Sequence, residues 1–237
     1  MRPDHDSASP WIRLRRSRLN LLVGLGFAAA MSGATCAWLP PADSGDDTPP
    51  PASNAIRRPV VLSTDHVLGS SDAPLVVVMY EDYQNAACGR FARAEFDAIK
   101  TEYIDTGRVR WVFRHFPSSG NARAKPAARA AECAHDQGFF LEYRNLIYAT
   151  VDADNKVILT DAKLKDHAET LGLDTTAFAT CYDEPDYKES RIQQDINSGT
   201  ALGVTNAPTF IVGSTRVTDA TTAAKLRTYL DRALAGG

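Results

Sequence analysis

The chain has 237 residues, of which 44% are hydrophobic and 23% are charged, and its formal net charge at pH 7 is -3. Five of the 26 basic residues and two of the 29 acidic residues lie within the first 18 positions, so the remainder is more acidic than the whole. An acidic chain without a basic stripe argues against nucleic-acid binding. A mean hydropathy of -0.26 argues against a polytopic membrane protein.

The amino terminus has the pattern of an export signal. Residues 1–18 form a basic region, residues 19–39 carry no charge, and residues 40–56 are rich in proline and small polar residues. A basic region followed by a long uncharged stretch is typical of a cleaved signal peptide or of a membrane anchor, and this length leaves both open. The flanking charges place the start inside and the rest outside. We therefore expect N-terminal membrane contact, a Pro-rich linker and a folded part on the periplasmic or extracytoplasmic face of the cell envelope.

Residues 57–237 predict one α/β domain. Strands are expected at residues 60–62, 75–80, 109–116, 209–212 and 215–217, and helices at residues 85–106, 122–134, 138–149, 161–171, 175–182, 187–202 and after Asp219, which is expected to cap the last helix. The apolar, β-branched run at 75–80 is typical of a central strand buried on both faces. This order predicts a mixed sheet covered on both faces, with a helical insert at about 118–203.

Four segments resemble those of the DsbA-like thiol–disulfide oxidoreductases. They are residues 75–91 (LVVVMYEDYQNAACGRF), 112–117 (VFRHFP), 127–134 (AARAAECA) and 201–212 (ALGVTNAPTFIV). The resemblance covers about residues 62–235. It implies a thioredoxin-like fold with an all-helical insertion between the central strands and the cis-proline strand, and an exported protein that exchanges disulfides with extended or unfolded protein clients without a cofactor. Pro208 matches the cis proline, and the backbone at Ala207 and Pro208 is implied to bind the client.

The redox motif of this family is Cys-x-x-Cys at a helix start, where the backbone N–H groups and the helix dipole stabilise the attacking thiolate. This chain has Asn85-Ala86-Ala87-Cys88 there, and an amide cannot form a mixed disulfide. Met79 stands where the family often carries a buried acid. Asn85 is expected either to cap the helix or to bind a thiol, a carboxylate or a peptide carbonyl. Cys88 is either an inert buried residue or a single reactive thiol.

Three functions are open at this point. The first is the family activity reduced to monothiol disulfide exchange through Cys88. The second is a redox-inactive peptide-binding or chaperone-like module that uses the groove beside Pro208. The third is a glutathione-dependent transferase or isomerase, which would make glutathione a ligand. The missing nucleophile favours the second function, and the family resemblance favours the first, so whether the chain is an enzyme is left open.

The remaining cysteines predict a structural disulfide. Cys36 lies in the apolar N-terminal segment and Cys88 in the expected core, so Cys133 and Cys181 of the insert form the natural pair. Some members of the family are similar in carrying a disulfide in the insert, and an export context permits its oxidation.

The five histidines show no metal-ligand spacing with cysteines or acids, so we expect no metal site. His115 is interpreted as a structural residue at a strand end, with an approach to the active site as the alternative. Residues 81–83 precede the first helix, and we expect them either to line the groove or to form a solvated loop.

Overall fold

The computed structural model describes residues 56–118, 120–150, 159–184 and 186–236. Residues 1–49 and 50–237 are separate units, and the described residues belong to the second. The expectations for residues 1–18 and 19–39, and for all but the last residue of 40–56, lie outside the described residues. Within the described ranges, no helix combines the length and the apolarity needed to cross a bilayer.

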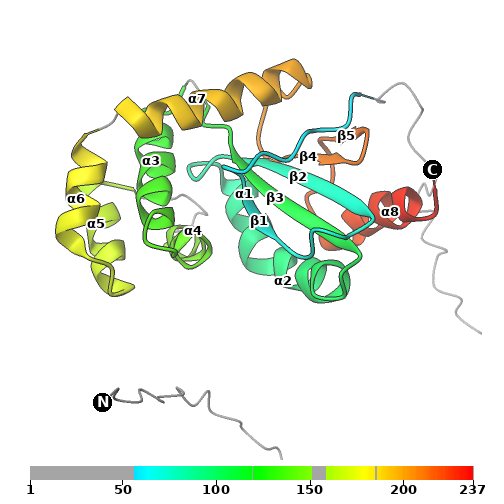
Figure 1. The fold of residues 1–237 in the computed structure, drawn as a ribbon, viewed down its shortest axis with the longest axis horizontal. Coiled ribbons are helices and arrows are strands. Elements are labelled where there is room, and N and C mark those ends of the chain that lie inside the picture. Colours follow the sequence, from blue (N-terminus) through cyan, green and yellow to red (C-terminus); the bar gives the residue numbers. More distant parts are fainter. Residues whose placement is uncertain (1–55, 119, 151–158, 185, 237) are drawn as a thin grey trace, which may run out of the picture. The chain divides into compact units, whose positions relative to one another are not determined.

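One mixed sheet of five strands has the order β1-β3-β2-β4-β5 (Figure 1). The strands are β1 (His66–Leu68), β2 (Leu75–Glu81), β3 (Val109–His115), β4 (Thr209–Val212) and β5 (Thr215–Val217). β2 pairs in parallel with β3, and the other three pairings are antiparallel. The expected central strand and terminal hairpin are confirmed.

The first expected strand, at residues 60–62, is wrong. Val60 is 71% exposed, and its carbonyl accepts a hydrogen bond from Arg114 Nη2 at 2.6 Å. The Leu62 N–H donates to Asp65 Oδ2 at 2.7 Å. Because side chains take these backbone groups, residues 60–62 form no ladder, and the strand begins instead at His66, opposite Phe113.

The first face of the sheet carries the N-terminal helical segment and the last helix. α1 (Ala86–Arg90) and α2 (Phe96–Ile99) are each followed by a π-helical turn, and together they run without a break to Ile104. α8 (Ala223–Leu234) begins after Thr222, whose hydroxyl accepts from the Lys225 N–H at 3.3 Å. The expectation that Asp219 caps this helix is wrong, because its carboxylate pairs with Lys225 Nζ and the Tyr229 hydroxyl.

The insert is helical throughout its described part, as expected. It contains α3 (Ala124–His135), α4 (Phe140–Ala149), α5 (Asp161–Thr170), α6 (Thr175–Asp183) and α7 (Asp186–Ala201), with bounds within two residues of the expected ones. The expected disulfide between Cys133 and Cys181 is present and ties α3 to α6, with 5.8 Å between the two Cα atoms.

α7 joins the insert to the second face of the sheet. In Figure 1 it runs along one side of the sheet, and α1 and α2 lie along the other. Near its start, Lys188 Nζ donates to Asp136 Oδ1 at 2.6 Å, at the end of α3. Near its end, the Ser198 hydroxyl lies 2.8 Å from the Tyr80 hydroxyl of β2. A Cβ at Gly199 would come within 2.9 Å of the Tyr80 ring, so only glycine permits this approach.

Alternate residues of β2 point into the two parts of the core. Val77 and Met79 join the larger cluster under α1, α2 and the insert, whereas Val78 and Tyr80 join the smaller cluster under the end of α7. This alternation follows from the period of two in a strand. It places the end of β2, and hence the start of α1, where the sheet, α4 and α7 meet.

Candidate functional site

The start of α1 is closed by the Asn85 side chain. Its Oδ1 accepts from the Ala87 N–H at 2.8 Å and from the Cys88 N–H at 3.3 Å. These are backbone donors that have no partner within the helix. The capping interpretation is therefore confirmed. With Oδ1 engaged, only the Nδ2 group of Asn85 is left to bind a ligand.

Cys88 is the third residue of α1 and is enclosed by the core. It is a free cysteine with no exposed surface. Burial raises the pKa of its thiol well above the usual value, although a hydrogen bond with the Asp82 backbone acts in the opposite direction. Because the thiolate is the nucleophile, this is the arrangement of an inert thiol.

A buried ion pair lies at the end of β2, ahead of the start of α1. Arg144 of α4 donates to Glu81 through Nη2 at 2.7 Å and through Nε at 2.8 Å. The side chains are 0% and 1% exposed. Burial by itself lowers the Arg144 pKa, but the charge and hydrogen bonds of Glu81 outweigh it and raise that pKa. The Tyr148 hydroxyl also donates to Glu81 Oε2, at 3.3 Å.

This ion pair corrects the expectation for residues 81–83. They form neither a solvated loop nor a groove lining, because Glu81, Asp82 and Tyr83 are all at most 3% exposed. A buried acid is therefore present two residues after Met79. Its carboxylate is held by Arg144. This pairing is not visible in the sequence, because the two residues lie 63 positions apart.

The peptide bond between Ala207 and Pro208 is cis, as the resemblance implied. Both residues are buried, whereas Thr205 and Asn206 before them are exposed. Tyr80 pairs with Thr209, so continuing this register by two residues puts Ala207 opposite Asp82, close to the start of α1. In the described part of the chain, no hydrogen bond engages the backbone of Ala207.

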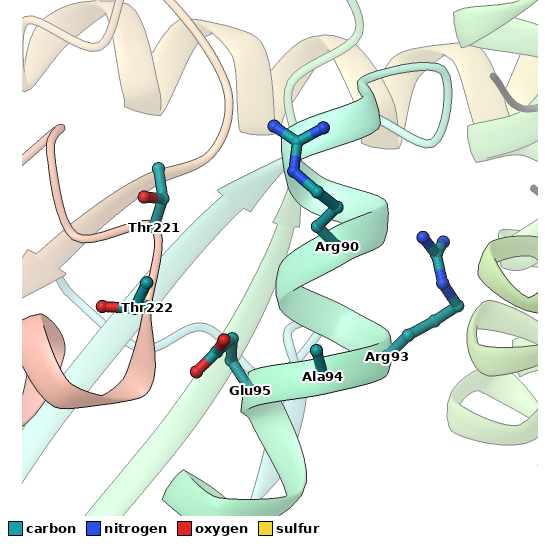
Figure 2. A pocket seen from close by; sticks show the side chains of 6 residues that line it. All are labelled: Arg90, Arg93, Ala94, Glu95, Thr221 and Thr222. Carbon is teal, nitrogen blue, oxygen red and sulfur yellow. The ribbon is translucent and has the colours of Figure 1, made fainter. Parts of the chain in front are cut away.

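A surface pocket of about 260 Å³ opens beside the same helix (Figure 2). Its lining comes from the helix and from the connection between β5 and α8: Arg90, Arg93, Ala94, Glu95, Thr221 and Thr222. Glu95 Oε2 accepts from the Ala223 N–H at 2.7 Å, and Arg93 Nη1 donates to the Tyr148 carbonyl at 2.9 Å. Arg90 is exposed, so its guanidinium is a cation at this pocket that solvent can reach.

A second buried polar cluster joins two histidines to one glutamate. His66 Nε2 and His115 Nε2 lie 2.7 and 2.8 Å from the same oxygen, Glu132 Oε1. All three residues are buried, and their potential ligand atoms lie within 4.8 Å of one another. His115 is thus a structural residue at the end of β3. The expectation that the histidines form no metal-type arrangement fails, because the fold brings together residues from β1, β3 and α3.

Sequence comparison places the chain among thioredoxin-like proteins. The family model described as Thioredoxin matches residues 62–232. One curated relative is "Na(+)/H(+) antiporter NhaA 1" of Mycobacterium sp. (strain KMS), 31% identical over 214 residues, which are 86% of this chain and 32% of the relative. Another is "Na(+)/H(+) antiporter NhaA 3" of Salinispora tropica, 36% identical over 67% of this chain and 23% of the relative. The chain spans about a third or less of these relatives, so their antiporter names describe much longer proteins.

Solved structures of DsbA-like proteins share the fold. Oxidised BdbD of Bacillus subtilis has a TM-score of 0.69 at 21% identity, over 77% of this chain and all of that one. Alpha-DsbA1 of Wolbachia pipientis has a TM-score of 0.62 at 22% identity, over 75% of this chain and 94% of that one. A thioredoxin-like oxidoreductase of Silicibacter pomeroyi has a TM-score of 0.59 at 26% identity, over 71% and 91%. The chain belongs to the thioredoxin family and has the fold of its DsbA-like members, with a degenerate redox motif.

Proposed function

We propose that the chain is an exported, redox-inactive member of the DsbA-like group that binds an extended segment of a client protein beside Ala207 and Pro208. The observation that carries this proposal is that the start of α1 has no accessible cysteine. Asn85 fills the position of the attacking cysteine and takes its N–H donors, and Cys88 is fully buried. Among the described residues, the scaffold therefore offers a backbone edge for a peptide and no accessible thiol.

The free backbone of Ala207 supports binding by addition of a strand. An extended peptide gains affinity from main-chain hydrogen bonds to such an edge. The Nδ2 group of Asn85 supplies a further donor for a peptide carbonyl. Among the described residues, Val60 is the only large hydrophobic side chain with high exposure. Recognition through the backbone and the polar pocket at Arg90 is therefore better supported than chaperone-like binding to an apolar surface.

Two observations support an extracytoplasmic location. The basic, uncharged and Pro-rich segments follow one another at the N-terminus as in an exported protein. The disulfide between Cys133 and Cys181 is a kind of bond that forms and persists in oxidising compartments. We propose that the folded part faces the periplasm or its equivalent, released by signal cleavage or held by an N-terminal anchor.

The test compares the full-length chain with its Asn85→Cys and Cys88→Ser variants in disulfide exchange with a client peptide. We expect the native chain to be inactive and Asn85→Cys to turn over, because that variant places a thiol at the helix start. Turnover by the native chain that Cys88→Ser abolishes would establish monothiol exchange and overturn the proposal. The family resemblance alone favours monothiol exchange.

Binding is measured separately, by fluorescence anisotropy with labelled extended peptides and by calorimetry with glutathione. We expect peptide binding that Asn85→Ala weakens and that Cys88→Ser leaves unchanged. Failure of every peptide to bind would contradict the binding role. Saturable glutathione binding would instead support the glutathione-dependent alternative.

A further inference from the structure

The most unusual polar cluster in the described chain lies in the core, between the sheet and the insert. It consists of His66 on β1, His115 on β3, and Glu132 and His135 on α3, and it is called here the histidine cluster. The first three residues are buried. His135 is exposed and lies against His66, with 4.4 Å between the ring centroids.

We propose that the histidine cluster binds one divalent transition-metal ion, with Zn²⁺ as the best fit. His66 Nε2, His115 Nε2 and a Glu132 carboxylate oxygen would be three ligands. A rotation of the exposed His135 side chain would supply the fourth. Three imidazoles and one carboxylate are a ligand set that suits Zn²⁺ well, whereas Ca²⁺ and Mg²⁺ prefer oxygen ligands.

The geometry supports convergence on a single point. Both Nε2 atoms approach the same oxygen, at 2.7 and 2.8 Å. In a tetrahedral zinc site, bonds of about 2.0–2.1 Å separate neighbouring ligand atoms by roughly 3.3 Å. An outward shift of roughly half an ångström per pair would therefore open the cluster for an ion. Movements of this size are side-chain adjustments and leave the backbone of the three elements in place.

The spacing on α3 adds a second, independent argument. Glu132 and His135 are three positions apart, and residues at that spacing share one face of a helix. Glu-x-x-His pairs on helices hold metal ions in helix-bundle proteins. His135 also lies beside His66 of β1, with 4.4 Å between the ring centroids, and its exposure gives an ion a route from solvent.

The ring nitrogens that point away from Glu132 leave the two buried imidazoles open to a metal. The Nδ1 atoms of His66 and His115 have no hydrogen-bond partner among the described residues. No acceptor therefore fixes either tautomer, and a proton can move from Nε2 to Nδ1 when a metal takes Nε2.

The ion would act as a clamp, because its ligands come from the edge strand, the central part of the sheet and the insert. The site shares no residue with the cap at Asn85 or with the pocket at Arg90, so this inference does not depend on the proposed binding function. A bound ion would stabilise the folded chain by an amount that rises with the logarithm of its concentration once that exceeds the dissociation constant.

The test uses the full-length chain, stripped with a chelator and titrated with Zn²⁺ by calorimetry. We expect saturation at one ion per chain and a rise in melting temperature with added Zn²⁺. Co²⁺ in place of Zn²⁺ should give the strong visible absorption of a tetrahedral site. His115→Gln and Glu132→Gln should weaken binding by more than the roughly 10–100-fold that loss of a second-shell partner costs.

His135→Gln and His167→Gln form the matched pair of controls. His135 is exposed, so its variant folds, and we expect it to weaken binding and to change the Co²⁺ spectrum. His167 lies outside the cluster, on α5, and its variant should bind as the native chain does. Absence of saturable binding overturns the proposal, as does binding that survives unchanged in both His115→Gln and His135→Gln. If the buried variants do not fold, the Co²⁺ spectra of the native chain and of His135→Gln decide alone.

Discussion

At the start of α1, the oxygen of Asn85 takes two backbone N–H groups that would otherwise stabilise a thiolate. Asn85 therefore stands in place of the thiolate in two respects: it occupies the position of the nucleophile, and its oxygen accepts the N–H groups at the positive end of the helix dipole. An amide cannot form a mixed disulfide, but it caps the helix and so keeps the first turn of α1 ordered.

Replacing Asn85 by alanine tests this reading. We expect Asn85→Ala to lower the free energy of unfolding by about 1 kcal/mol, because two N–H groups lose their acceptor. Asn85→Asp keeps an acceptor and should cost a few tenths of that loss or less. Urea unfolding followed by circular dichroism measures both. Equal stability of the alanine variant and the native chain would show that water replaces the cap without cost.

For single residues, the sequence was enough to predict features that depend on short motifs or on the positions of a few cysteines. The cap at Asn85 and the cis bond at Pro208 lie within short motifs, and the pairing of Cys133 with Cys181 followed from where the four cysteines lie. The ion pair of Glu81 and the contacts of Glu132 were missed because each joins residues far apart in the chain.

At the scale of elements, the ion pair between Glu81 and Arg144 joins the end of β2 to α4. Both side chains are fully enclosed, so each charge depends on the other. The guanidinium also lies 4.5 Å from the centroid of the Phe113 ring and 5.0 Å from that of Tyr148. The pair therefore fixes the insert against the strand that leads into the helix start.

Breaking this pair from one side should be costly. We expect Arg144→Met to lower the free energy of unfolding by about 3–5 kcal/mol, because the Glu81 carboxylate is left buried without a partner. The double variant Glu81→Gln with Arg144→Met should be more stable than Arg144→Met alone, since no charge is left uncompensated. Chemical denaturation of the three proteins gives the comparison. A double variant no more stable than the single one would assign the loss to packing rather than charge.

Element boundaries followed the sequence where a hydrophobic period is strong. The run at β2 and the helices of the insert were placed within two residues. The strand expected at residues 60–62 and the helix cap expected at Asp219 were both wrong for the same physical reason. In each case, hydrogen bonds or ion pairs to distant or neighbouring polar groups replaced the expected ones. Residues 60–62 give their backbone groups to Arg114 and Asp65, and Asp219 pairs with Lys225 and Tyr229, which leaves the cap to Thr222.

For the whole molecule, the order of strands and helices was enough to predict a mixed sheet with one parallel pair and a terminal hairpin, because parallel pairing requires a crossover and hairpins pair antiparallel. The order of the five strands in the sheet was not predicted. The placement of α7 across two parts of the fold was not predictable. It depends on the close approach of Gly199 to Tyr80 and Phe116, and on partners such as Asp136 and Ser198 that no local pattern reveals.

The stability of the whole molecule should fall in mild acid through His167. Burial, followed by the charge of Lys163, lowers its pKa from 6.5 to about 4. The unfolded chain therefore binds a proton between pH 6.5 and 4 that the folded chain does not, so stability is present above pH 6.5 and is lost as the pH falls through this window. Urea unfolding of the native chain and of His167→Gln across these pH values measures the effect. We expect a shallower pH dependence in the variant, and identical slopes would contradict the assignment.

The helix α7 has a mechanical consequence. Its 16 residues span about 24 Å, with one end fastened to α3 and the other pressed on the sheet. A rigid rod fixed at both ends transmits displacement instead of absorbing it. The insert and the sheet therefore move together as one frame. A client held at Ala207 would meet a surface of constant shape, rather than one that closes around it.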